Sequence, residues 1–103
     1  MLSHNVFFSL HDNSPAAIDR LVVACKTYLS NHPGTCFFAA GTLADEYQRS
    51  VNDRAFDVAL LVVFIDGASH DAYQRAPRHL KFIEENKPNW KQVRVFDAWV
   101  EGK

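Results

Sequence analysis

Tyr73 and His79 are the residues best suited to chemistry in this sequence, six positions apart on either side of Pro77. A neutral imidazole, with a reference pKa of about 6.5, can remove a proton from a carbon that lies between carbonyl groups. A tyrosine hydroxyl can donate a hydrogen bond to the carbonyl oxygen that then gains charge. The pair therefore predicts a proton-abstraction site, with a purely structural hydrogen bond between His79 and Tyr73 as the alternative.

Two more polar residues fall among apolar ones in strand-like segments. His4 alternates with apolar residues of the first segment, so we expect it beneath the helices, hydrogen-bonded in the core. Asp57 shares its predicted strand face with alanine, leucine and valine, and a carboxylate there needs a partner, which we expect to be His4 or His79. These three residues could bind a metal by ligand type, but they lack motif spacing, so we expect no metal site.

Tyr28 lies on the apolar stripe of a predicted helix, and we expect its hydroxyl at the edge of a pocket. Cys25 and Cys36 form no CxxC motif, which indicates packing residues. We expect the side chains of His11, His32 and His70 to be exposed. The sequence has no phosphate-binding glycine loop or nucleotide fingerprint, so we expect no cofactor.

The elements that position these residues follow from apolar periodicity and from turn residues. Ser14 and Pro15 have the residue types of an N-cap and a first helical position, and Pro33-Gly34 ends the helix that they begin. A polar loop is expected over 44–55. The pattern predicts strands over 4–10, 35–43, 56–64 and 93–100, and helices over 15–31, 68–74 and 77–86.

This order of strands and helices predicts an α+β fold, a ferredoxin-like β-α-β-β-α-β sandwich with a four-stranded antiparallel sheet, as a single domain over 1–103. Residues 56–64 are mainly apolar in both alternate sets, so both faces of that strand should be buried. Because the helices can cover only one face, the other should meet a second copy in a homodimer. We expect four phenylalanines at that interface: Phe7, Phe37, Phe56 and Phe96.

Composition restricts the class of protein. The 103 residues are 48% hydrophobic and 22% charged, which indicates a globular chain. The net charge of −1 argues against nucleic acid as a partner. The longest apolar run is too short to cross a membrane, and the N-terminus does not look like a signal peptide, so we expect a cytoplasmic protein with no membrane partner.

Taken in order, several segments resemble the stress-response A/B barrel domain, also called the dimeric A/B barrel or Dabb domain. They are His4 with the following Val6-Phe7-Phe8, Pro33-Gly34, Gly41, the run 56–64, Asp71-Ala72-Tyr73, Pro77-Arg78-His79 with Phe82, and Phe96-Asp97. The resemblance covers nearly the whole chain. It implies a ferredoxin-like unit paired through its sheet into a homodimeric barrel.

One member of that family, a plant polyketide cyclase, closes an aromatic ring by intramolecular aldol condensation. The resemblance places its catalytic tyrosine and histidine at Tyr73 and His79, and its supporting histidine and tyrosine at His4 and Tyr28. The chain departs from the cyclase at Asp57, where the cyclase has histidine.

The resemblance thus implies a pocket between sheet and helices for a small apolar or carbonyl-rich molecule, with aldol or lyase chemistry that needs no cofactor. Two alternatives stay open. One is a non-catalytic stress or interaction protein that acts through its dimer surface. The other is a monooxygenase, which the fold alone suggests.

Overall fold

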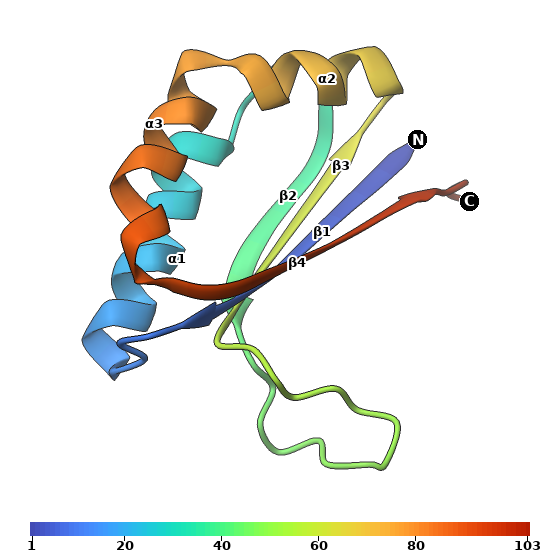
Figure 1. Cartoon of the computed structure of the whole chain (residues 1–103). Coiled ribbons are helices and arrows are strands. Elements are labelled where there is room, and N and C mark those ends of the chain that lie inside the picture. The colour runs from blue at the N-terminus through green and yellow to red at the C-terminus, as the bar shows by residue number, and fades with distance from the viewer.

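The computed structural model describes all 103 residues and has one antiparallel sheet with three α-helices on one of its faces (Figure 1). The strands are β1 (Leu2–Leu10), β2 (Thr35–Thr42), β3 (Val58–Phe64) and β4 (Trp90–Trp99), and the sheet order is β2-β3-β1-β4. The helices are α1 (Pro15–Leu29), α2 (Gly67–Arg75) and α3 (Pro77–Asn86), and a 3₁₀ turn covers Lys87–Asn89. The ferredoxin-like β-α-β-β-α-β prediction is confirmed.

The first helix begins and ends where the local sequence indicates. The Ser14 hydroxyl accepts a hydrogen bond from the Ala17 backbone N–H at 3.3 Å, and Pro15 occupies the first turn, where it forfeits no helical hydrogen bond. The helix stops at Leu29, two residues earlier than predicted, because Ser30 is extended and Asn31 is left-handed with φ of 61°. This turn leads the chain into the outer strand β2.

The core lies between the sheet and the helices. Alternate residues of β1 and β3 are buried there, including Phe8, Val58 and Leu60, and they pack against Leu21 of α1 and Phe82 of α3. Each buried side chain of this size contributes about 1.5–3 kcal/mol. Because successive side chains of a strand point to opposite faces, the remaining residues of β3, such as Ala59 and Leu61, lie on the opposite face of the sheet.

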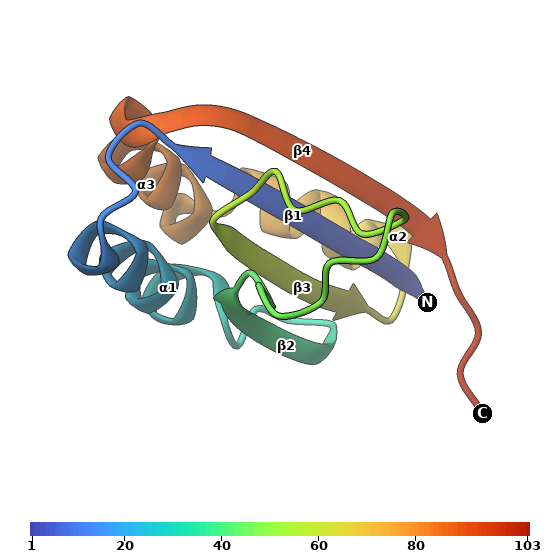
Figure 2. The ribbon, with the colours of Figure 1, turned by 90° about the horizontal axis from the view of Figure 1, so that it is seen from below.

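That opposite face carries no helix. Leu61 and the small residues Ala39, Gly41 and Ala59 line a shallow hollow on it, beside Phe7. The Phe7 ring packs edge-on against Phe56 and Phe96, and Phe37 is more than half exposed on the same face. Figure 2 shows the loop between β2 and β3 crossing in front of β1 and β3. We call this helix-free surface the open sheet face.

Gly34 is the position where a side chain should be least tolerated. Its φ is +83°, which costs other residues about 1–3 kcal/mol, and a Cβ atom there would overlap the Ser69 side chain at the start of α2. Gly34→Ala should therefore lower the free energy of unfolding in urea by at least that amount. Asn31→Gly, at the neighbouring left-handed position, is the matched control and should cost little; equal stability of the two variants would contradict the packing described.

Candidate active site

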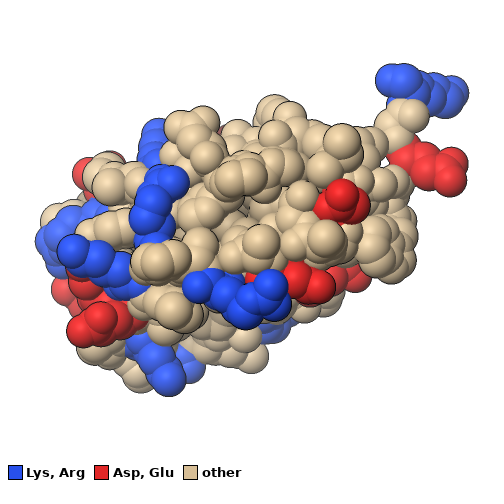
Figure 3. Space-filling model, turned by 90° about the horizontal axis from the view of Figure 1, so that it is seen from above, with Lys and Arg blue, Asp and Glu red and all other residues tan.

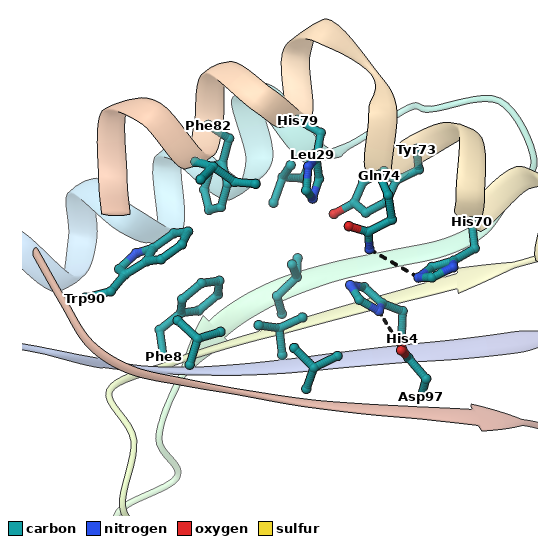
Figure 4. A pocket seen from close by; sticks show the side chains of 15 residues that line it. His4, Phe8, Leu29, His70, Tyr73, Gln74, His79, Phe82, Trp90 and Asp97 are labelled. Carbon is teal, nitrogen blue, oxygen red and sulfur yellow. Dashed lines mark hydrogen bonds and ion pairs between the residues drawn. The ribbon is translucent and has the colours of Figure 1, made fainter. Parts of the chain in front are cut away.

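A cavity of about 440 Å³ opens between the sheet and the α2–α3 pair (Figure 4). This volume lies within the range of small-molecule sites. Most of its wall is apolar, with a few polar groups that converge from β1, α2, α3 and β4. Its lining consists of His4, Val6, Phe8, Leu29, Leu60, His70, Tyr73, Gln74, His79, Phe82, Ile83, Trp90, Val93, Val95 and Asp97.

Tyr73 and His79 lie together in this cavity, as the sequence predicted. Their rings meet edge-on with centroids 4.6 Å apart, and both residues are buried. The Tyr73 hydroxyl and His79 Nδ1 have no hydrogen-bond partner in the protein, so the predicted alternative, a structural hydrogen bond between them, does not form. Buried polar atoms are seldom left unpaired, and two of them beside a cavity indicate groups available to a ligand.

The break between α2 and α3 is what brings the two side chains together. Asp66 caps α2 by accepting a hydrogen bond from the Ser69 N–H at 2.8 Å, and the helix ends when Ala76 turns extended. Pro77 then starts α3 in a new direction. Tyr73 projects from the last turn of α2 and His79 from the first turn of α3, and Figure 4 shows both pointing toward the cavity.

His4 and Asp97 form a hydrogen-bonded pair at one end of the cavity. They are cross-strand partners on β1 and β4, and Asp97 Oδ1 lies 2.5 Å from His4 Nδ1. A carboxylate can only accept, so Nδ1 carries the hydrogen and Nε2 keeps a free lone pair. In Figure 4 the second ring nitrogen of His4 faces the cavity. The carboxylate fixes the ring and would stabilise an imidazolium formed there.

The prediction that His32 and His70 are exposed is wrong. Because α2 extends over Gly67–Arg75, His70 shares a face with Tyr73 and Gln74, and its ring lies 4.9 Å from that of His4. The Gln74 amide donates to His70 Nε2 at 3.2 Å. His32 is buried against the edge of Tyr73, with its Nε2 donating to a backbone carbonyl of α1 at 2.8 Å.

His4, His70 and Asp97 also offer atoms that could bind a metal ion, all within 4.8 Å of one another. Two ligands of a tetrahedral zinc ion are about 3.3 Å apart, given bonds of about 2.0 Å. The 2.5 Å between His4 Nδ1 and Asp97 Oδ1 is shorter than that, and these two atoms are already hydrogen-bonded to each other. The cluster therefore fits a proton-transfer pair better than a metal centre.

Burial governs the protonation of the cavity. Burial, with a smaller contribution from the neighbouring histidines His4, His32 and His70, lowers the pKa of His79 to about 4. Burial also lowers the pKa of His4, although the hydrogen bond to Asp97 opposes that shift. Burial raises the pKa of Tyr73, so its hydroxyl stays protonated and remains a donor at neutral pH.

Stability should fall in mild acid because of His79. The unfolded histidine has a pKa of about 6.5 and the folded one about 4, so between these values the unfolded chain binds more protons. The free energy of unfolding in urea should be level above pH 6.5 and should decrease as the pH falls toward 4. His79→Gln should flatten this decrease, whereas His11→Gln, in an exposed turn, should not. A wild-type protein that gains stability in this window would contradict the assignment.

Two residues predicted to line the pocket, Asp57 and Tyr28, lie elsewhere. Asp57 precedes β3, and its carboxylate accepts a hydrogen bond from the Leu10 N–H at 2.8 Å, so it reaches neither His4 nor His79 and their metal triad does not assemble. The Tyr28 hydroxyl donates to Glu85 at 2.8 Å on the outer side of α1 and α3. The expected pairing of Asp57 with a histidine is made instead by Asp97.

Solved structures resemble this chain in fold. A Dabb-family protein from Mesorhizobium loti is 22% identical with a TM-score of 0.77, and covers 98% of this chain and 97% of its own. A hydroxynitrile lyase from Passiflora edulis is 21% identical with a TM-score of 0.76, over 99% and 94%. A dimeric ferredoxin-like protein of unknown function from Thermobifida fusca is 16% identical with a TM-score of 0.77, over 96% and 90%.

A search of curated protein sequences finds no match. No helix of the structure has both the length and the apolar character to cross a membrane. Residues 2–100 match the family described as the Stress responsive A/B Barrel Domain, or Dabb, which is the family that the residue pattern resembles. The chain therefore belongs to the stress-responsive A/B barrel (Dabb) family.

Proposed function

We propose that the cavity binds a small molecule that carries a carbonyl group and removes a proton from the carbon next to that group. The observation that carries this proposal is that the Tyr73 hydroxyl and His79 Nδ1 are buried and unpartnered beside the His4–Asp97 pair in a mostly apolar cavity. Proton abstraction next to a carbonyl is the common first step of aldol and related lyase reactions.

The base in this proposal is His4, and Tyr73 and His79 contact the carbonyl oxygen. A base works best with a pKa close to the working pH, and the pKa of about 4 makes His79 a weak one. His4 can take the proton on Nε2, and Asp97 would stabilise the resulting imidazolium. Tyr73 remains protonated and can donate to the oxygen that becomes an enolate. The role of His79 therefore differs from the sequence-based hypothesis, which made His79 the base, whereas Tyr73 keeps its role as the donor.

Deuterium exchange into 2-acetylnaphthalene tests this function. In D₂O, a base that removes a methyl hydrogen next to the ketone replaces it with deuterium, which proton NMR detects as loss of the methyl signal. The protein should accelerate this exchange above the buffer rate, and Tyr73→Phe should slow it by about tenfold or more because the enolate loses a donor. An exchange rate equal to that of buffer would contradict the catalytic proposal.

We propose further that the chain is a homodimer formed through the open sheet face. Structural neighbours are described as dimeric. On this chain, Phe37 and Phe96 are more than half exposed on that face, and apolar patches of this kind mark interfaces. The hollow lined by Ala39, Gly41 and Ala59 can receive a large side chain of the partner. A non-catalytic protein that acts through this surface is the second candidate, and it predicts dimerisation without exchange.

A further inference from the structure

We infer that the cavity selects uncharged ligands over carboxylates of the same size and shape, an inference that rests on the proposed binding function. The inference rests on the charges of the residues that line the cavity. None of its residues is a lysine or arginine, and Asp97 is the one carboxylate among them. A ligand carboxylate in the cavity would therefore find no lysine or arginine to pair with.

The position of Asp97 strengthens the rejection of anions. Its side chain is 42% exposed while it bonds to His4, so a negative charge lies where the cavity meets solvent. The nearest arginine on β4, Arg94, is directed to the other face of the sheet, where it pairs with Asp53 at 2.7 Å. On the helix side, lysines and arginines gather mainly at the end formed by α1 and α3 (Figure 3).

His4 and His79 do not replace the missing cation at neutral pH. Burial lowers the pKa of both His4 and His79, so their rings are neutral there. A ligand carboxylate in this cavity would lose its hydration without gaining an ion pair, which is a costly exchange. A ketone oxygen, in contrast, needs only a hydrogen-bond donor, and the Tyr73 hydroxyl is unpartnered. Selection is thus against negative charge and not against polarity.

Two compounds of nearly equal shape test the inference. They are 2-acetylnaphthalene, which carries a methyl ketone, and 2-naphthoate, which carries a carboxylate at the same position. Titration calorimetry on the wild-type protein at pH 7.5 should give an affinity for the ketone higher by roughly tenfold or more. Equal or tighter binding of the carboxylate, with the ketone also bound, would overturn the inference and leave the binding function intact. Binding of neither probe would overturn the proposed function itself, and the inference with it.

A variant with a positively charged side chain in the cavity wall provides a second test of the inference. Val95 lines the cavity on β4 and is 49% exposed, so an arginine there can reach the ligand without being buried. Val95→Arg should raise the affinity for 2-naphthoate relative to that for 2-acetylnaphthalene by about tenfold. The control is Val23→Arg on α1, similarly exposed and away from the cavity, which should leave both affinities as in the wild type. An unchanged ratio of the two affinities in Val95→Arg would count against the inference.

Discussion

Replacing His4 by alanine should slow deuterium exchange into 2-acetylnaphthalene by about 100-fold or more, because a positioned base contributes roughly that factor to proton transfer. The position of His4 in the wild-type protein explains the size of this expected effect. His4 Nδ1 is held by Asp97 at 2.5 Å, and its other nitrogen faces the cavity. NMR measurement of the exchange rate at saturating protein, at pH 7.5, checks this expectation.

Two comparisons make the result specific to the base. Asp97→Asn keeps a side chain of the same shape but removes the charge that stabilises the imidazolium, so it should slow exchange less than His4→Ala does. His70→Ala removes a neighbouring ring of the same kind and should have a smaller effect than His4→Ala. If His4→Ala exchanges as fast as the wild type while His79→Ala loses the activity, the base is His79 and the assignment made above is wrong.

Leu61→Lys should convert the dimer to a monomer. Leu61 lies on the open sheet face beside the hollow, and burying an unpaired ammonium there would raise the dissociation constant by about 100-fold or more. Sedimentation of the wild type at about 10 μM should give twice the mass of one chain, and the variant should give the mass of one chain.

A matched lysine separates loss of the interface from general damage. Val23→Lys, on the exposed side of α1, should sediment as the wild type does. A lysine at Val58 or Leu60 would not be informative, because both side chains are buried in the core beneath the helices. A wild-type protein that sediments as a monomer would contradict the proposed interface.

The fold could be predicted from the sequence because its signals are local. The apolar stripe of α1, its Ser14 cap and the glycine at Gly34 are each readable from neighbouring residues. The sequence predicted the ends of the strands less accurately than the elements themselves. β4 begins at Trp90 instead of 93, directly after the 3₁₀ turn, and β3 begins at Val58 instead of 56.

The site was predicted only in part because it depends on register and on a choice of face. Both alternate sets of β3 are apolar, so the sequence does not show which set faces the helices, and Asp57 was expected on the wrong face. The His4–Asp97 pair follows from the register of β1 on β4, which no local pattern determines. Tyr73 and His79 could be predicted because the short segment around Pro77 brings them together.

A crystal structure of the protein with 2-acetylnaphthalene bound would locate the ligand relative to Tyr73 and His4. We expect the naphthyl ring within the apolar part of the cavity, against Phe8 and Phe82. We expect the ketone oxygen about 2.8 Å from the Tyr73 hydroxyl oxygen and the methyl carbon next to His4 Nε2. A ligand bound outside the cavity, or bound inside it with the ketone directed away from Tyr73, would contradict the proposed function.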